Sequence, residues 1–325
     1  GMAQSCLRAG LRVHGFDVVS EQAARFVEEG GASGSFTAVA STLDAIVLVV
    51  LNAKQVEEVL FGEDGVVASL RKGAVVMACA TVPPDFAKEM ERRCADSGIH
   101  YLDAPISGGS VKAAHGQLGV MASGSTTAFA AAKPILDATA QTVFRLGDTA
   151  GAGSAMKAAN QLLAGVHIAT MAEAMTFGMT QGIEPDMFLD VISQCAGTSW
   201  MLEHRAPHII SGDYTPHSQV NIWPKDLGIV LDVAKTAGFE APITEMALSR
   251  YRKAVEMGLG GEDDAAVAKV YAAHANLTLP ENQSLNFAAS GTTSQAPVTC
   301  PTCLPSQEGA SWCIPAVHHR HGHRM

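Results

Sequence analysis

The sequence has little of several features that mark other classes of protein. Aromatic residues make up only 6% of its 325 residues, and no run of Lys and Arg interrupts a net charge of −10. A negative chain without a basic patch is not typical of proteins that bind nucleic acid. Its apolar runs, such as residues 45–51, are far too short to cross a bilayer, and no cationic segment followed by an apolar core marks a signal peptide. We therefore expect no nucleic-acid partner, no membrane partner and, by default, a cytoplasmic location.

The seven cysteines do not form the spaced framework of a disulfide-rich domain. Four are scattered through the periodic part of the chain and are expected to be reduced thiols: Cys6, Cys79, Cys94 and Cys195. The other three, Cys300, Cys303 and Cys313, lie with several histidines in residues 279–325, which show no periodicity. We predict that this tail is disordered. Zinc binding by the tail is the alternative, but the spacing matches no closed site, so no metal is expected.

The first 147 residues alternate short apolar segments with helical ones. Strands are expected at 11–17, 44–52, 73–81, 99–107, 117–124 and 141–147. Helices are expected at 2–9, 21–30, 53–62, 83–98 and 125–140. This alternation predicts a mostly parallel α/β sheet that is covered by helices on both faces.

From Gly151 onward the pattern is helical only. Residues 154–182 contain no proline and predict one helix of roughly 43 Å, at 1.5 Å per residue. Further helices are expected at 184–197, 224–238, 242–258 and 263–276. The chain is thus expected to hold an α/β domain at 1–149, an all-helical domain at 150–278 and the tail at 279–325.

The pattern at the start of the chain indicates the second half of a βαβ unit. A helix at 2–9 and a turn at Gly10 lead into a strand that ends at Asp17, but no strand or glycine-rich loop precedes them. An acid at this position can bond the ribose hydroxyls of a dinucleotide and repel a 2′-phosphate, which favours NAD over NADP. The alternative is an ordinary aspartate in a turn.

Ser107, Gly108 and Gly109 follow a buried strand. Ligands gather at the carboxyl ends of parallel strands, and two glycines let backbone N–H groups converge on an anion. The serine adds a hydroxyl donor, so the triplet suits a carboxylate. A plain turn is the alternative, because Ser-Gly-Gly is common in loops.

Two lysines occupy positions where a charged side chain is unfavourable. Lys157 lies on an apolar helix, with Asn160 three residues later on the same face. A desolvated lysine suits a general acid/base, although a lysine can also extend to solvent. Lys225 lies in the first turn of a helix expected to begin at Pro224, where its charge opposes the helix dipole. We expect Lys225 to contact a cofactor or a carboxylate; a solvated lysine is the alternative.

These segments, in this order, resemble the 3-hydroxyisobutyrate dehydrogenase (β-hydroxyacid dehydrogenase) family over residues 1 to about 278. The resemblance rests on "DAPISGG" followed by "LGVMASG", on "GAGSAMKAAN" and on "PKDLGI". Within the family, "LNAKQVEEVLFGEDGV" and "GLGGEDDAAVAKVY" are most similar to the L-threonate dehydrogenase branch.

The resemblance implies a fold, a reaction and a set of site residues. The fold is a Rossmann-like NAD-binding domain followed by an all-helical domain with a long interdomain helix. The reaction is NAD-dependent oxidation of a small hydroxy acid, such as L-threonate or 3-hydroxyisobutyrate, by a homodimer or homotetramer. Lys157 is the implied general acid/base, Asn160 orients the substrate, and Ser107, Gly108 and Gly109 bind its carboxylate. The implied cofactor contacts are Gly1, Met2, Asp17, Asn52, Thr81 and Lys225.

The start of the chain departs from the family pattern. Family members begin with a strand and a Gly-x-Gly-x-x-Gly-x-Gly loop, of which Gly1 resembles the last glycine. We expect the missing strand to leave new sheet edges and the missing loop to weaken NAD binding. An incomplete gene model or a fragment is the expected explanation, and a targeting peptide would lie in the missing part. The alternatives are a non-catalytic scaffold and an imine-reducing relative, but the latter replaces the lysine that Lys157 retains.

Overall fold

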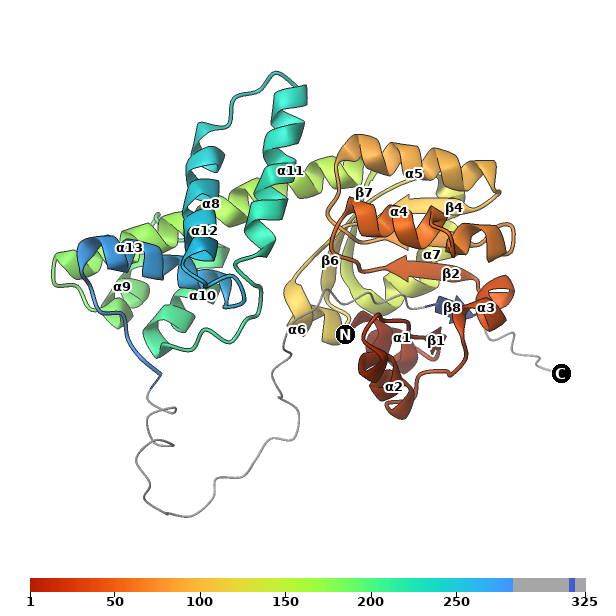
Figure 1. The fold of residues 1–325 in the computed structure, drawn as a ribbon, viewed down its shortest axis with the longest axis horizontal. Helices are drawn as coiled ribbons and strands as arrows, with labels where there is room; N and C mark the ends of the chain where they lie inside the picture. Colours follow the sequence, from red (N-terminus) through yellow and green to blue (C-terminus); the bar gives the residue numbers. More distant parts are fainter. Residues whose placement is uncertain (283–315, 319–325) are drawn as a thin grey trace, which may run out of the picture. The chain divides into compact units, whose positions relative to one another are not determined.

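The computed structural model describes residues 1–282 and 316–318, and these divide into two compact units (Figure 1). Unit 1 contains Gly1–Ala159 together with strand β8 (Ala316–His318). Unit 2 contains the described residues from Asn160 onward. The division falls inside helix α8 (Ala152–Thr180), several residues after the boundary expected at 149–150.

Unit 1 is an α/β unit built around one sheet. Its other strands are β1 Arg12–His14, β2 Ala45–Leu48, β3 Val75–Ala78, β4 His100–Asp103, β5 Ile106–Ser107, β6 Leu118–Ser123 and β7 Ala140–Gly147. Its helices before α8 are α1 Met2–Arg8, α2 Ser20–Glu28, α3 Phe36–Val39, α4 Ala53–Phe61, α5 Pro84–Asp96, α6 Gly109–Ala114 and α7 Thr126–Thr139. Two 3₁₀ turns, η1 Ala40–Thr42 and η2 Val66–Ser69, complete it. The α/β prediction is confirmed.

The sheet is mixed rather than mostly parallel as predicted, with strand order β1-β8-β2-β3-β4-β6-β5 and β7 beside β6. Strands β2, β3 and β4 are parallel to one another, as are β6 and β7, whereas β6 is antiparallel to β4 and β5. The strand expected at 99–107 is two strands, β4 and β5, separated by Ala104 and Pro105. Proline has no N–H to continue the ladder, and beyond it the chain pairs with β6.

Strand β8 lies between β1 and β2 and is antiparallel to both (Figure 1). Val317 is opposite Val13 of β1 and Ala45 of β2. The expectation that the missing strand leaves new sheet edges does not hold at β1 and β2, because another segment of the chain pairs with both. This segment comes from the tail predicted to be disordered. The rest of that tail beyond Asn282, including Cys300, Cys303 and Cys313, lies outside the described residues.

Two apolar clusters cover the two faces of the sheet. Ile46 and Leu48 of β2 pack in the cluster that contains Val56 and Leu60 of α4. Ala45 and Val47, which alternate with them, belong to the other cluster, which contains buried residues of α1 and α7. This period of two is that of a strand buried on both faces. The prediction of helices on both faces is confirmed.

Unit 2 is all-helical, as expected. Besides the larger part of α8, its helices are α9 Pro185–Ile192, α10 Trp200–Ser211, α11 Ile222–Thr236, α12 Pro242–Glu256 and α13 Ala268–Ala275, with the 3₁₀ turn η3 Asp264–Val267. Helix α10 is absent from the sequence prediction, because Pro207 interrupts its helical pattern. The structure nevertheless buries Leu202, Ala206 and Ile209 on one face of α10.

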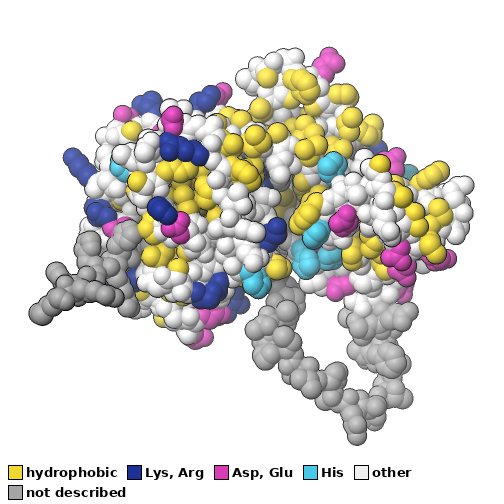
Figure 2. Space-filling view, turned by 180° about the vertical axis from the view of Figure 1, so that it is seen from behind, with side chains coloured by type: hydrophobic (Ala, Val, Ile, Leu, Met, Phe, Trp, Pro, Cys, Tyr) yellow, Lys and Arg dark blue, Asp and Glu magenta, His cyan; other side chains and the backbone are white. Residues whose placement is uncertain are grey.

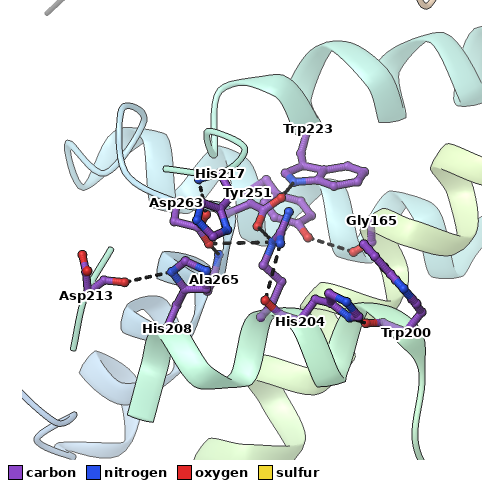
Figure 3. A network of polar contacts seen from close by, with 12 residues as sticks. Gly165, Trp200, His204, His208, Asp213, His217, Trp223, Tyr251, Asp263 and Ala265 are labelled. Atoms are coloured by element: carbon purple, nitrogen blue, oxygen red, sulfur yellow. Dashed lines mark hydrogen bonds and ion pairs between the residues drawn. The ribbon is translucent and has the colours of Figure 1, made fainter. Parts of the chain in front are cut away.

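A buried polar network joins α10, α11 and α12 inside unit 2 (Figure 3). Arg205 donates to Asp264 at 2.5 Å, and the indole of Trp223 donates to the same carboxylate at 3.0 Å. The ring of Trp223 stacks on that of Tyr251, whose hydroxyl donates to the carbonyl of Gly165 at 2.8 Å. The network thereby ties three helices to the middle of α8.

Helix α8 differs from the expectation that every apolar segment is too short for a bilayer. Among the described helices, it alone has the length and composition of a membrane span, with a window of mean hydropathy 1.3. However, 44% of that window is buried within the protein, and a core helix has the same length and composition. Length and composition therefore do not assign a membrane partner to α8.

Candidate active site

Lys157 lies in the second turn of α8 and is buried, with only 8% of its surface exposed. Its Nζ donates a hydrogen bond to the backbone carbonyl of Ile106 at 2.9 Å. The interpretation of Lys157 as a lysine that extends to solvent is therefore wrong. Ile106 directly precedes Ser107, so the lysine is held at the segment predicted to bind a carboxylate.

The glycines before Lys157 allow α8 to begin close to the sheet. A Cβ on Gly153 would come within 2.5 Å of the Met121 carbonyl and 2.8 Å of the Asp103 carbonyl. The neighbouring Gly151 has φ of +106°, a left-handed conformation that favours glycine. Glycine at these two positions thus permits a close approach. The approach is to the backbone of β4 and β6.

Ser107, Gly108 and Gly109 lie where β5 ends and α6 begins. Gly108 has φ of +132° and Gly109 has φ of +71°, and side chains larger than hydrogen disfavour both values. A Cβ on Gly108 would also meet the side chain of Lys112 at 2.8 Å. The backbone of this segment therefore requires glycine at both positions. The chain turns at Gly108, directly after Ser107.

Gly1 and Asp17, both predicted cofactor contacts, line one pocket of about 140 Å³. Gly1 is the N-cap residue of α1, and Asp17 follows β1. One oxygen of Asp17 accepts the N–H of Val19 at 2.9 Å, as an aspartate in a turn does. Most drug-sized ligands occupy larger cavities, roughly 300–1,000 Å³. This pocket is smaller than that range.

The remaining predicted cofactor contacts of unit 1 lie in different surroundings. The side chain of Met2 is buried in an apolar cluster, so only its backbone is left to meet a ligand. The Asn52 side chain accepts the N–H of Gln55 at 2.9 Å and so caps α4. Thr81 is half-buried and follows β3, at the end of the sheet where the parallel strands terminate.

In unit 2 a chain of polar contacts links Asn160 to Lys225. Asn160 donates to Gln161 at 3.0 Å, and Gln161 donates to Asp226 at 2.5 Å. The other oxygen of Asp226 forms an ion pair of 2.6 Å with Lys225. Helix α11 begins at Ile222, two residues before the predicted start at Pro224. The adjacent carboxylate of Asp226 offsets the unfavourable position of Lys225 in the first turn.

Two family profiles match consecutive parts of the chain. The NAD-binding domain of 6-phosphogluconate dehydrogenase matches residues 1–147. The profile described as NAD-binding of NADP-dependent 3-hydroxyisobutyrate dehydrogenase matches residues 151–271. The two matches meet just before α8.

Individual relatives agree with these profiles. An L-threonate dehydrogenase of Cupriavidus necator is 48% identical over 272 residues, which is 83% of this chain and 92% of the relative. An L-threonate dehydrogenase of Escherichia coli K12 is 46% identical over 87% of this chain and 94% of its own length. The crystal structure of a 3-hydroxyisobutyrate dehydrogenase from Salmonella typhimurium is 46% identical, with a TM-score of 0.76, over 83% of this chain and 94% of its own. The chain therefore belongs to the 3-hydroxyisobutyrate dehydrogenase family of NAD-dependent hydroxyacid dehydrogenases, in its L-threonate dehydrogenase branch.

Proposed function

We propose that this chain oxidises the hydroxyl group of L-threonate, or of a closely related small hydroxy acid, with NAD as the hydride acceptor. The observation that carries the proposal is the buried Lys157, held at the carbonyl of Ile106 directly before Ser107–Gly109. This position supports Lys157 as the general base and Ser107–Gly109 as the carboxylate-binding turn, because oxidation of a hydroxy acid requires the two groups to be adjacent. The names of the bacterial relatives support L-threonate as the first substrate to test.

The residues of unit 1 fit one part of NAD. A pocket with Gly1 and Asp17 among its lining residues supports binding of a ribose with free hydroxyls. We assign the remaining cofactor contacts to Met2, Asn52, Thr81 and Lys225, as the family resemblance implies. NAD, when bound, supplies the hydride acceptor.

Residues of the chain itself bind the substrate, accept its proton and orient it. The substrate carboxylate binds the hydroxyl of Ser107 and the N–H groups of Gly108 and Gly109. Lys157 Nζ takes the proton from the substrate hydroxyl as that carbon is oxidised. Asn160 follows Lys157 by three residues, so both side chains leave the same side of α8, and we assign Asn160 to orienting the substrate.

Replacement of Lys157 tests this proposal. We expect Lys157→Ala to lower kcat by about 10²–10⁴-fold, the range for loss of a general base, while the fold is retained. The measurement is the rate of NADH formation with L-threonate, with circular dichroism as the check on folding. Lys133→Ala is the matched control, because Lys133 is an exposed lysine on α7 that forms a surface ion pair with nearby Asp137. Normal turnover in Lys157→Ala would contradict the assignment.

We also propose that the chain forms a homodimer or homotetramer. Exposed apolar side chains of unit 2 support this, including Phe239, Ile243 and Met246, which are 61–67% exposed. Figure 2 shows hydrophobic side chains spread over the visible face, with charges of both signs interspersed among them. Light scattering at increasing protein concentration measures the oligomeric state, and a monomer at all concentrations would contradict the proposal.

A further inference from the structure

Asp103, the last residue of β4, is a carboxylate that is 1% exposed. One of its oxygens accepts the backbone N–H groups of Gly151 at 2.9 Å and Ser154 at 2.8 Å, and the hydroxyl of Ser123 at 3.3 Å. The other oxygen accepts the hydroxyl of Ser154 at 2.7 Å. Four donors thus converge on one buried side chain, and two of them are backbone groups at the start of α8.

This arrangement has a clear physical reason. The first N–H groups of a helix have no partner within the helix, and the helix dipole favours a negative charge beside them. Burial raises the pKa of Asp103, whereas the bonds from Ser154, Gly151 and Ser123 act to lower it. The carboxylate therefore bears a desolvation cost that a surface cap would not, and its bonds to α8 offset part of that cost.

Two further contacts hold the same turn of the chain. The Ser123 hydroxyl accepts the N–H of Gly153 at 2.9 Å, and Glu91 of α5 accepts the N–H of Ala150 at 3.1 Å. Ser123 is itself bonded to Asp103. All of these residues belong to unit 1, so Asp103 lies at the centre of the bonds that fix where α8 begins.

The same segment also holds Lys157. Asp103 and Ile106 are three residues apart, and each holds α8 at a different point. Asp103 binds Ser154, and Ile106 accepts from Lys157 one helical turn later. We propose that Asp103 is a positioning residue, which fixes the first turns of α8 on residues 103–106 and thereby holds Lys157 Nζ beside Ser107–Gly109. The expected effect of Asp103 on turnover rests on the proposed function, whereas its expected effect on the position of Lys157 does not.

Two substitutions separate the geometry of Asp103 from its charge. Asp103→Asn keeps the shape and an oxygen that accepts both backbone N–H groups, but it removes the charge. Asp103→Ala removes the charge and every acceptor, so Gly151 and Ser154 lose their shared partner. If Asp103 acts by position, only the alanine variant should release Lys157. If Asp103 acts by its charge, both variants should change the labelling rate of Lys157 equally.

The first readout is chemical labelling of lysine with limiting acetic anhydride, followed by mass spectrometry. The rate at Lys157 is divided by the rate at exposed Lys133 in the same sample. We expect Asp103→Ala to raise this ratio by about tenfold and Asp103→Asn to change it by less than about twofold, since roughly one helix cap is lost in the first case and retained in the second. An unchanged ratio in Asp103→Ala, or an equal rise in both variants, would overturn the proposal.

Ser125→Ala is the matched control, because the Ser125 hydroxyl caps α7 of the same unit by accepting the N–H of Ala128 at 3.1 Å. It should lower stability without changing the labelling of Lys157. If Asp103→Ala does not fold, Ser154→Ala replaces it, since this variant removes one of the four bonds to Asp103. We then expect a rise of about threefold in the labelling ratio, smaller than for loss of the whole cap, and no rise would overturn the proposal.

The second readout is steady-state kinetics. We expect Asp103→Ala to lower kcat by about 10–100-fold, the cost of displacing a catalytic group by roughly 1 Å, with an unchanged KM for NAD. Asp103→Asn should restore most of that rate. A wild-type protein without turnover would contradict the proposed function, and the labelling result would still decide the role of Asp103.

Discussion

At the scale of single residues, Lys157 and Asp103 differ in how far the sequence could predict them. Lys157 is a lysine on an apolar helical face, so its residue type and its spacing from Asn160 already suggested a special role. Asp103 lies in the same motif as Ser107, but its role depends on bonds to Gly151 and Ser154, about fifty residues away. No local pattern reports such a contact. The sequence therefore singled out Lys157, but not Asp103, to which the first turn of its helix is bonded.

Asp264 is a second buried carboxylate whose behaviour depends on its surroundings. Burial raises its pKa to about 6, although Arg205 and Trp223 bond to it. Because the folded state holds this proton more tightly than the unfolded state, its contribution to stability is full below about pH 4 and is lost as the pH rises through about 6.

The difference in unfolding free energy between wild type and Asp264→Asn should therefore decrease as the pH rises from 4 to 6. The expected change is at most about 3 kcal/mol. Urea unfolding at a series of pH values measures it. Asp186→Asn, a change at an exposed carboxylate on α9, should follow the wild-type profile. A constant difference across this range would contradict the pKa of Asp264.

At the scale of elements, the periodic segments were predictable and the exceptions have local causes. Strands β2 and β3 and helices α4 and α5 lie within the predicted ranges, because apolar spacing and the residues at their ends define them. Pro105 divides one predicted strand into two. Strand β8 could not be foreseen, because three residues in an aperiodic segment have no pattern and acquire their structure from β1 and β2.

The pairing of β8 leads to a specific prediction. Val317→Pro removes a backbone donor in the middle of β8 and should weaken its pairing with both neighbours. We expect amide hydrogen exchange in β1 and β2 to accelerate by about tenfold, which corresponds to about 1.4 kcal/mol. Val317→Thr keeps the donor and should exchange as wild type does. Equal exchange in the proline and threonine variants would show that β8 does not protect the sheet.

At the scale of the whole molecule, each unit has its own apolar core. Leu48 is fully buried in the core of unit 1, and Met175 is fully buried in that of unit 2. The composition and the change from alternating to helical pattern predicted this division. The position of the division inside α8 was not predictable, since a continuous helix shows no break in its sequence.

Separate cores predict separate unfolding transitions. Leu48→Ala and Met175→Ala should each cost about 2–5 kcal/mol, as large-to-small changes in packed cores do. In differential scanning calorimetry, we expect each substitution to lower the midpoint of one transition and leave the other in place. A single transition that shifts with either substitution would mean that the two cores unfold as one.

The place of β8 in the sheet also determines when the sheet is complete during synthesis. Strands β1 and β2 are made early, whereas β8 is the last described element to leave the ribosome. At roughly 5–20 residues per second, β1 waits on the order of tens of seconds for this partner. During that time the edges of β1 and β2 are open to pairing with other nascent chains. Closing so long a loop also adds an entropic cost that slows folding, so yield in the cell should depend on chaperones more than the stability of the finished protein suggests.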